Sequence, residues 1–549
     1  MLIDYNSLGG TAPPATDVVV VGSGAAGFSM ATELARFGLT VLIVEAGNFS
    51  NDRKILADDF QTDVVKNHAE GHLYRRRMVG GTTTVWGGRC IPYEQSDFQD
   101  LSAGDGARWP IKYDEVQPFI LPAMTWLQAG DSNFYAEQAL PNRPRQMVPS
   151  DDNSVSLDEI ERFSLPTNSW RSHGQALVRG KNVHLLYNCM VVELVGNHAN
   201  EASYDIRVAT PDGKSQNIKC PILVLATGGL ETPRLLLASR SNRPQGVGNE
   251  ADLVGRFFMT HVIADLGQLK VYNKKLVALN YENAKDGAYV RRLIKVAPEK
   301  RKELNLMNLI ARPAMPNFAD PKHESAVLSL AFLAKRFVIQ EYRDRIIQEY
   351  AGSQVGLAPH FANIIKSTPS LATFGVDWIF RRILASRKLP ALFLDGAASY
   401  PLQIIGEQAP LRRSRISLSD KKDRYGVPRI NIDWQTCSDD AISMDLSMRT
   451  IERSLSNNKI ARIELSELEY ENLPNMLVPQ GGHHIGTARM ANSPADGVTD
   501  QWGKVWGSSN LYIAGSAVFP RSGVANPTLM IVAMTLRTAQ HIKNNKYNK

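Results

Sequence analysis

The sequence is poor in cysteine, with four residues in 549 and no Cys-x-x-Cys pair. This spacing disfavours both a disulfide framework and a zinc site, so we predict no metal centre. Few cysteines also fit a reducing, cytoplasmic setting. No apolar run reaches about 18 residues, so no membrane-spanning helix is expected. The first residues lack the basic and apolar regions of a secretory signal.

Basic residues only slightly outnumber acidic ones. Lys and Arg number 62 against 55 Asp and Glu, which gives a formal net charge of +7. The basic residues form short clusters without the motif of a nucleic-acid-binding module, so no nucleic-acid partner is predicted. With 43% hydrophobic and 21% charged residues, the chain can bury a large core, which excludes an intrinsically disordered protein.

The strongest local pattern lies near the N-terminus. An apolar strand at Asp17–Val21 precedes Gly-Ser-Gly-Ala-Ala-Gly at 22–27, a helical pattern at 28–37 and a second apolar strand at 41–44. Glu45 ends that strand, about 20 residues after the glycines. Strand, glycine turn, helix, strand and acid in this order predict a dinucleotide-binding βαβ unit.

Four residues of this unit have distinct expected tasks. Gly22 permits the tight turn, Gly24 lets backbone N–H groups approach a pyrophosphate, and Gly27 lets the helix pack against the strand. Glu45 would accept hydrogen bonds from a ribose, and its charge would repel a 2′-phosphate. The unit therefore favours FAD or NAD over NADP.

Three more segments extend the expected binding site. Residues 77–89 hold four glycines and three threonines around one tryptophan, a composition that disfavours a helix and predicts a loop close to a ligand. Residues 221–229 read as a buried strand ending in Gly-Gly. Residues 511–514 form another strand, which runs into Gly515 and precedes an apolar helix from Thr528. If these segments meet the first unit, they surround one long ligand, which suits FAD better than NAD.

Other segments give weaker signals. Helical spacing covers roughly 113–127, and strand-like segments occur at 183–186 and 191–195. Residues 376–394 place apolar side chains at helical spacing among four basic residues. This stretch is either a basic amphipathic helix that touches a membrane surface or a helix that packs on its own core.

Seven short motifs together resemble the glucose-methanol-choline (GMC) oxidoreductases, flavoenzymes that oxidise alcohols. The match follows the family's order over most of the chain. Glu407-Gln408, Ser414-Arg415 and Gly426–Arg429 resemble a bacterial branch associated with sugars, pyranoses and aminoglycosides. The motifs are Gly22–Gly27 with Glu45, Gly80–Thr82, Trp109–Ile111, Ala226–Gly229, Val254–Arg256, His483–Thr487 and Asn526–Leu529.

The resemblance implies an α/β fold of two interleaved domains. A Rossmann-like FAD-binding domain would comprise residues 1–100, 181–260 and 471–549. An α+β substrate-binding domain would comprise mainly residues 101–180 and 261–470. The length is then explained by one large active site rather than by a string of modules.

The family's catalytic pair maps onto His483, three residues before Gly486, and Asn526, directly before the Pro-Thr-Leu helix start. Histidine with a pKa near 6.5 can be a neutral proton acceptor at physiological pH. Asn526 would hold the substrate oxygen in place. His484 is the competing base, because adjacent side chains of an extended segment point to opposite faces. His261, which follows an apolar stretch, is expected to be structural.

The resemblance also implies the cofactor contacts. Arg77, Gly81 and Thr82 would lie near the pyrophosphate and flavin and Val192 near the adenine, while Thr528 would place a helix N-terminus at the flavin. The complete expected set is Gly22, Ser23, Gly24, Ala26, Gly27, Glu45, Ala46, Arg77, Gly81, Thr82, Val192, Ala226, Thr227, Gly228, Gly515, Ser516, Pro527 and Thr528.

Val85, Trp86, Glu407 and His484 are expected at the substrate, although Glu407 could equally be a buried, paired glutamate. Relatives that bind FAD covalently carry a histidine where this chain has Val85, so noncovalent FAD is expected. The expected reaction is hydride transfer from an alcohol to flavin N5, with oxygen, a quinone or a redox protein as electron acceptor. A lipid alcohol as substrate, or a flavin-binding protein without redox turnover, are the alternatives.

Overall fold

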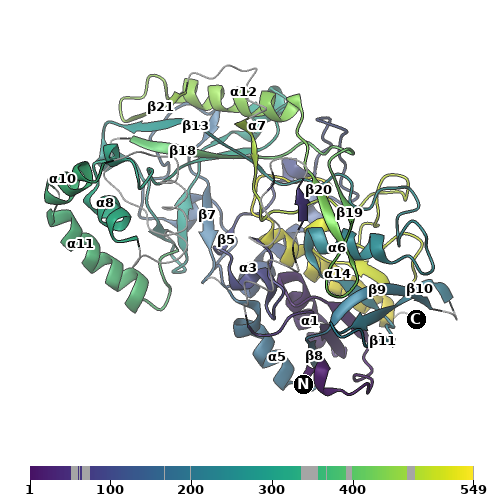
Figure 1. Ribbon diagram of the computed structural model, residues 1–549. Coiled ribbons are helices and arrows are strands. Elements are labelled where there is room, and N and C mark those ends of the chain that lie inside the picture. Colours follow the sequence, from purple (N-terminus) through teal and green to yellow (C-terminus); the bar gives the residue numbers. More distant parts are fainter. Residues whose placement is uncertain are drawn as a thin grey trace.

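The structure is a computed structural model in which the central feature is a six-stranded, all-parallel sheet with strand order β1-β8-β3-β2-β12-β23 (Figure 1). It describes residues 1–50, 60, 62–64, 68, 74–165, 167–197, 200–335, 356–366, 368–390, 399–466 and 476–547. The strands of the sheet are β1 (Leu2–Asp4), β2 (Val18–Val21), β3 (Val41–Val44), β8 (Val183–Tyr187), β12 (Leu223–Leu225) and β23 (Leu511–Ile513).

Five of the six strands of the parallel sheet fall in segments predicted as strands, and the edge strand β1 is not predicted. β2 and β3 are runs of four buried aliphatic residues, as expected of strands covered on both faces. Helix α1 (Ala25–Arg36) joins them and packs against α14 (Thr528–Tyr547) from the other end of the chain (Figure 1). The α/β, Rossmann-like class is therefore confirmed. All six strands fall in the three segments assigned to the FAD-binding domain, whose boundaries stay a prediction.

A second layer, at the upper left of Figure 1, is antiparallel. Its main sheet has the order β17-β18-β13-β21, with β22 also paired to β13 and helix α12 packed on β21. The ranges are β13 (Val262–Val271), β17 (Leu309–Pro313), β18 (Ser399–Gly406), β21 (Ala461–Leu465), β22 (Val478–Pro479) and α12 (Ser438–Leu455). A large apolar core underlies each layer.

Smaller elements complete the molecule. Antiparallel β9 (Met190–Asn197), β10 (Asn200–Ala209) and β11 (Ser215–Ile218) form one sheet. The remaining strands are β4 (Thr62–Val64), β5 (Arg89–Cys90), β6 (Val155–Ser156), β7 (Ile160–Phe163), β14 (Glu282–Asn283), β15 (Tyr289–Arg292), β16 (Lys295–Val296), β19 (Arg415–Lys422) and β20 (Pro428–Asp433). The other α-helices are α3 (Ile120–Trp126), α4 (Ala136–Ala139), α5 (Gln175–Arg179), α6 (Gly228–Ala238), α7 (Pro298–Glu303), α8 (Ala326–Leu333), α10 (Ala358–Lys366) and α11 (Thr368–Trp378).

Two predicted helices differ from the structure. The pattern at 113–127 forms two short 3₁₀ turns before α3, and Pro118 lies in the second turn, where it supplies no N–H for a longer helix. The stretch 376–394 comprises the end of α11 and a π-helical segment, Ile379–Leu384, while 391–394 lies outside the described residues.

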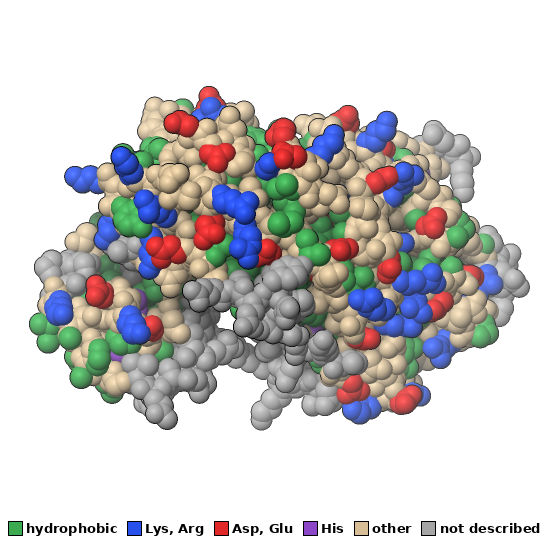
Figure 2. Space-filling view, turned by 90° about the horizontal axis from the view of Figure 1, so that it is seen from above, with side chains coloured by type: hydrophobic (Ala, Val, Ile, Leu, Met, Phe, Trp, Pro, Cys, Tyr) green, Lys and Arg blue, Asp and Glu red, His purple; other side chains and the backbone are tan. Residues whose placement is uncertain are grey.

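The surface carries charges of both signs. Acidic and basic side chains are interspersed on the face shown in Figure 2. Within the described part of the chain, no helix is both long enough and apolar enough to cross a membrane.

Candidate active site

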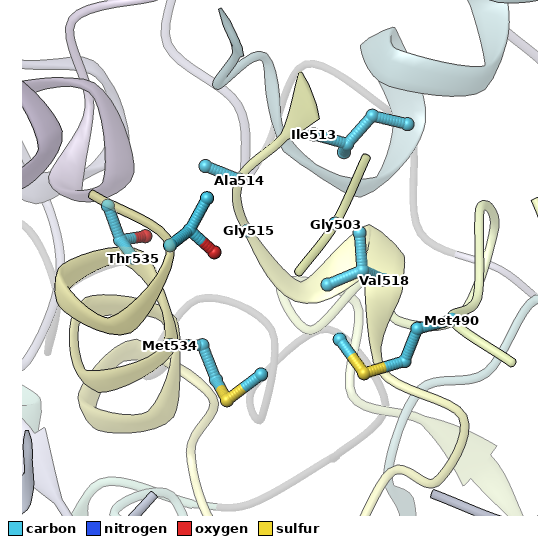
Figure 3. Close-up of a pocket in the computed structure, with 9 residues that line it drawn as sticks. Met490, Gly503, Ile513, Ala514, Gly515, Val518, Met534 and Thr535 are labelled. Carbon is cyan, nitrogen blue, oxygen red and sulfur yellow. The ribbon is translucent and has the colours of Figure 1, made fainter. Parts of the chain in front are cut away.

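A cavity of about 860 Å³ lies at the carboxyl ends of β2, β3, β12 and β23. Open α/β sheets bind their ligands at this edge. A second, apolar void of about 10 Å³ lies between α14 and the segment after β23, where Met490, Val518 and Met534 converge (Figure 3). It has room for about one water molecule, so the large cavity is the candidate site.

The glycine turn after β2 forms one wall of the cavity. Gly22 has φ 101°, and a Cβ there would lie 2.5 Å from the carbonyl oxygen of Ala226. A Cβ on Gly27 would lie 1.9 Å from the Gly22 carbonyl oxygen, so α1 approaches the turn at a distance that only glycine allows. Gly24 differs, because a Cβ there would meet no atom of the described residues within 4 Å. Its backbone therefore faces the cavity, ready for close contact with a ligand.

Glu45 is buried at the end of β3, and its carboxylate stabilises the glycine turn by hydrogen bonds. One oxygen accepts hydrogen bonds from the Ser23 backbone N–H and hydroxyl, at 3.0 and 2.6 Å, and the other accepts from the Gly47 N–H at 2.9 Å. Burial raises the pKa of Glu45, while these hydrogen bonds and the charge of Arg77 oppose the shift. Glu45 also lines the cavity, and its expected contact with a ribose stays a prediction.

Three helices begin at the cavity. The N-terminal residues of α1, α6 and α14 all line it. Helix N-termini carry partial positive charge and unpaired N–H groups, which favour a pyrophosphate or a negatively charged ring. Among the residues that the structure describes, a Cβ on Gly228 or Gly515 would meet no atom within 4 Å, as at Gly24. These open backbone positions and the size of the cavity fit FAD.

A second wall of the cavity is basic and aromatic. Arg77 stacks over the Phe60 ring at 4.8 Å, and Arg75 forms an ion pair with Glu231 at 2.5 Å. Glu231 also pairs with Arg234 at 3.0 Å. The two arginines hold the pKa of Glu231 at about 2 against the effect of burial. The wall therefore keeps its charges at neutral pH.

His483 and Asn526 meet at the same cavity. His483 follows β22, which pairs with the start of β13, and Asn526 precedes α14. Asn526 Nδ2 lies 3.1 Å from His483 Nε2. On the other side of the ring, His483 Nδ1 lies 2.7 Å from Nδ1 of the fully buried His261. Burial, then the electrostatic interactions with His261 and Arg89, lower the pKa of His483 well below 6.5, so the ring is neutral at physiological pH.

His484 lines the cavity as well but contacts other groups. Its ring centroid lies 5.9 Å from that of His68 and 6.2 Å from that of Phe258. Burial lowers its pKa, and His68 and Arg75 add to the shift. His483 is therefore the histidine of this pair that contacts Asn526.

A cluster of buried charged side chains adjoins the cavity at Arg89. Glu161 pairs with Arg89 at 2.9 Å, with Arg291 at 2.5 Å and with Arg312 at 3.1 Å. Arg89 lines the cavity, and together these arginines hold the pKa of Glu161 at about 2. Three cations around one carboxylate give this group a net positive charge near His483.

The predicted substrate residues separate into two groups. Val85, with 47% of its surface exposed, and Trp86 line the cavity, and the Trp86 indole donates to the Thr167 carbonyl at 2.8 Å. Glu407 does not line it. Its buried carboxylate accepts from the Arg521 guanidinium at 2.7 and 2.8 Å, which corresponds to the paired-glutamate alternative.

Most predicted cofactor residues surround the cavity. Gly27 and Val192 are not among the lining residues; Gly27 packs α1 against the turn, and the neighbours Met190 and Val191 line the cavity in place of Val192. The lining includes Gly22, Ser23, Gly24, Ala26, Glu45, Ala46, Arg77, Gly81, Thr82, Ala226, Thr227, Gly228, Gly515, Ser516, Pro527 and Thr528.

Sequence reasoning missed two residues of the site. Arg89 carries no signal in the sequence beyond its place at the end of the glycine-rich loop, and the sequence predicts only a structural role for His261. His261 lies 222 positions from His483, and no spacing motif joins them. In the described residues, no group of three or more His, Cys, Asp or Glu side chains could hold a metal ion.

Comparison with known proteins agrees with this geometry. Residues 410–535 match the family model described as GMC oxidoreductase, and residues 16–106 match that of pyridine nucleotide-disulphide oxidoreductase. The chain is 21% identical to 2-methyl-1,2-propanediol dehydrogenase of Mycolicibacterium austroafricanum, over 97% of this chain and 96% of the relative. It is 23% identical to the fructose dehydrogenase large subunit of Gluconobacter japonicus, over 96% and 98%. It is also 23% identical to paromamine 6′-oxidase of Streptomyces fradiae, over 96% and 91%.

Solved structures share the fold. A fungal aryl-alcohol oxidase has a TM-score of 0.56 at 14% identity and covers 98% of this chain and 100% of its own. Pyridoxine 4-oxidase from Mesorbium loti has a TM-score of 0.53 at 16% identity and covers 96% and 99%. The fold is therefore shared over nearly the whole length of the chain.

Proposed function

Because the chain belongs to the GMC oxidoreductase family and is an FAD-dependent alcohol oxidoreductase, we propose that it oxidises a hydroxyl group of a sugar, cyclitol or glycosylated metabolite. The single observation that carries the proposal is the contact between His483 Nε2 and Asn526 Nδ2 at the cavity wall. The substrate class is supported by the fructose dehydrogenase subunit and paromamine 6′-oxidase, which match along nearly the whole chain.

His483 is the general base. The substrate hydroxyl donates to Nε2 of the neutral ring, and its oxygen accepts from Asn526 Nδ2. At 3.1 Å the two nitrogens leave no room for an oxygen between them, so the hydroxyl binds beside them and replaces their mutual hydrogen bond. Asn526 thereby fixes the direction of the carbinol C–H bond. The hydroxyl proton moves to Nε2, and the carbon loses a hydride, which leaves a carbonyl.

FAD, when bound, supplies the hydride acceptor, flavin N5. The chain contributes the three helix N-termini and the open glycine backbone at positions 24, 228 and 515. We propose that FAD is bound noncovalently, because Val85 offers no nucleophilic atom in the tryptophan loop. The four cysteines are free, which supports a location in the cytoplasm.

The test is an anaerobic screen of alcohols with the FAD-loaded protein, in which bleaching of the flavin absorbance reports hydride transfer. Sugars, cyclitols and glycosides should bleach the flavin, and His483→Ala should abolish bleaching while FAD stays bound. His484→Ala is the matched control, since it removes the adjacent ring from the same cavity. If the flavin bleaches in His483→Ala but not in His484→Ala, the general base is His484 and not His483. Re-admission of air then separates an oxidase from a dehydrogenase.

A lipid alcohol is the second candidate substrate, favoured by exposed apolar side chains on α10, α11 and the π-helical segment. Ile365 is 77% exposed and Leu384 65% exposed, and single helices seldom expose so much apolar surface. The same helices carry Lys366, Arg381 and Arg382, which suits an anionic lipid surface. The other exposed apolar residues described on these helices are Phe361, Val376, Ile379, Phe380 and Ile383, and Leu357 lies directly before α10.

Vesicle flotation tests this candidate. The protein should float with vesicles that contain anionic lipid, and Phe380→Ser/Ile383→Ser should reduce the floating fraction without changing flavin reduction by a soluble alcohol. Absence of the wild-type protein from the floating fraction would remove the lipid candidate and leave the sugar proposal intact.

A further inference from the structure

His261 is fully buried and contacts His483, but it takes no part in the proton or hydride transfer proposed for the site. Its Nδ1 lies 2.7 Å from Nδ1 of His483, and its Nε2 lies 3.1 Å from the carbonyl oxygen of Ser522. Both nitrogens of His261 are therefore in hydrogen-bond contact, one with a titratable ring and one with a group that can only accept.

The carbonyl of Ser522 decides the tautomer of His261. Because a carbonyl oxygen has no proton to give, His261 Nε2 must carry the hydrogen of this bond. The same oxygen accepts from the Tyr93 hydroxyl at 2.5 Å, so it is held in place by two donors. Burial lowers the pKa of His261 to about 4, so the ring is neutral and its Nδ1 bears a lone pair.

The tautomer of His483 follows from that of His261. With a lone pair on His261 Nδ1, the shared hydrogen belongs to His483 Nδ1. The neutral His483 ring then has its own lone pair on Nε2, where the Asn526 amide donates. In the opposite tautomer, His261 would carry its hydrogen on Nδ1 and a lone pair on Nε2. Nε2 and the Ser522 carbonyl oxygen would then be two acceptors in contact without a hydrogen between them.

We infer that His261 is a positioning residue that holds His483 in its Nδ1-protonated tautomer and so keeps the basic lone pair on Nε2, toward Asn526 and the substrate. The inference rests on the proposed role of His483 as general base. When Nε2 takes the hydroxyl proton, His483 becomes a cation, and its Nδ1–H bond to the neutral His261 strengthens. No further proton leaves the pair.

The backbone fixes the two rings relative to each other. The His261 carbonyl accepts from the Gln480 N–H at 2.8 Å, and Met259 bridges Ile485 on the far side of both histidines. β13 and β22 continue this ladder beyond the His261–Gln480 bond, where Val262 pairs with Pro479. Since these are main-chain bonds, changing the side chain of His261 leaves them in place.

Two substitutions separate the proposed role from simple packing. His261→Asn places an amide oxygen near the position of Nδ1, where it can accept from His483 Nδ1. His261→Phe keeps a planar ring but offers no acceptor. We expect flavin reduction at least about tenfold slower in the Phe variant than in the Asn variant, because general base catalysis is worth about 10²–10⁴ in rate. His541→Phe, a ring on α14 outside the cavity lining, should reduce flavin at the wild-type rate.

Long-range ¹H–¹⁵N correlation spectra of histidine-labelled, FAD-loaded protein give a readout that is independent of turnover. The His483 signals, assigned by their loss in His483→Asn, should show protonated Nδ1 and unprotonated Nε2 in the wild type. In His261→Phe the proton should shift to Nε2. A wild-type spectrum with protonated Nε2, or equal flavin reduction rates in the Phe and Asn variants, would overturn the inference. Bleaching that survives in His483→Ala would instead refute the proposed base.

Discussion

Nε2 of His483 and Nδ2 of Asn526 lie 3.1 Å apart, although the two residues come from the loop after β22 and the start of α14. The amide can serve as a donor there because Nε2 has a lone pair. A substrate hydroxyl that enters the site must find both functions, an acceptor for its hydrogen and a donor for its oxygen.

Asn526→Asp should slow flavin reduction by about 10²–10³, as loss of a donor to a developing oxyanion does elsewhere. The carboxylate removes the N–H donor, and its negative charge raises the pKa of His483, so less neutral base is present. Asn526→His is the matched variant, because a ring N–H restores the donor without the charge. Rapid-mixing measurements of flavin absorbance at saturating alcohol compare the three proteins. Wild-type speed in Asn526→Asp would contradict the role given to the amide.

The glycines of the first turn offer a second test, because Gly27 and Gly24 face different surroundings. Gly27→Ala should destabilise the protein by about 1–3 kcal/mol, the usual cost of overpacking, since its Cβ would overlap the Gly22 carbonyl oxygen. Gly24→Ala should leave stability nearly unchanged but weaken FAD binding, since its Cβ would point into open cavity. Urea unfolding of the apoprotein measures the first effect and FAD titration the second. A Gly24→Ala protein that binds FAD as tightly as the wild type would exclude close backbone contact there.

The turn, helix and strands of this unit could be predicted because their determinants are local. The two aliphatic strands, the glycine turn and the acidic residue all lie within about 30 residues, as in other βαβ units. The apolar spacing predicts one helix at 113–127, whereas Pro118 lies in a 3₁₀ turn and the α-helix begins only after it, at Ile120.

The site itself was predictable only in part. His483 and Asn526 belong to motifs, but the environment that makes His483 neutral does not. The position of Arg89 at the cavity depends on its ion pair with Glu161. The contact of His261 with His483 depends on the pairing of β13 with β22. Such contacts depend on tertiary register, which no spacing along one chain encodes.

Noncovalent FAD is a third prediction. Acid precipitation of the loaded protein should release all of the yellow colour, because the position that carries a histidine in relatives with covalent FAD has no nucleophile in this chain. Val85 has no nucleophilic atom. Cys189 lines the cavity, but burial raises its pKa, so it remains a thiol. Absorbance of the supernatant, compared with the total before precipitation, gives the released fraction. Colour that stays with the precipitate would show a covalent bond.

The charge of Arg89 should set the pH range in which the enzyme works. Arg89 lowers the pKa of His483, after burial and His261. Since the protonated ring cannot accept a proton, the rate of flavin reduction falls as the pH drops through this pKa, and it should stay constant above 6.5 in the wild type. Arg89→Gln removes the charge, raises the pKa of His483 and moves the fall in rate to higher pH.

Arg89→Lys is the control that isolates charge from shape, because it keeps the cation and should leave the fall in rate near its wild-type position. Glu161 stays paired in both variants, since Arg291 and Arg312 still contact its carboxylate. Flavin reduction followed from about pH 5 to pH 8, the range in which histidine titrates, compares the three proteins. If Gln and Lys moved the profile equally, the geometry of Arg89 would govern His483; if only Gln moves it, the field of the guanidinium does.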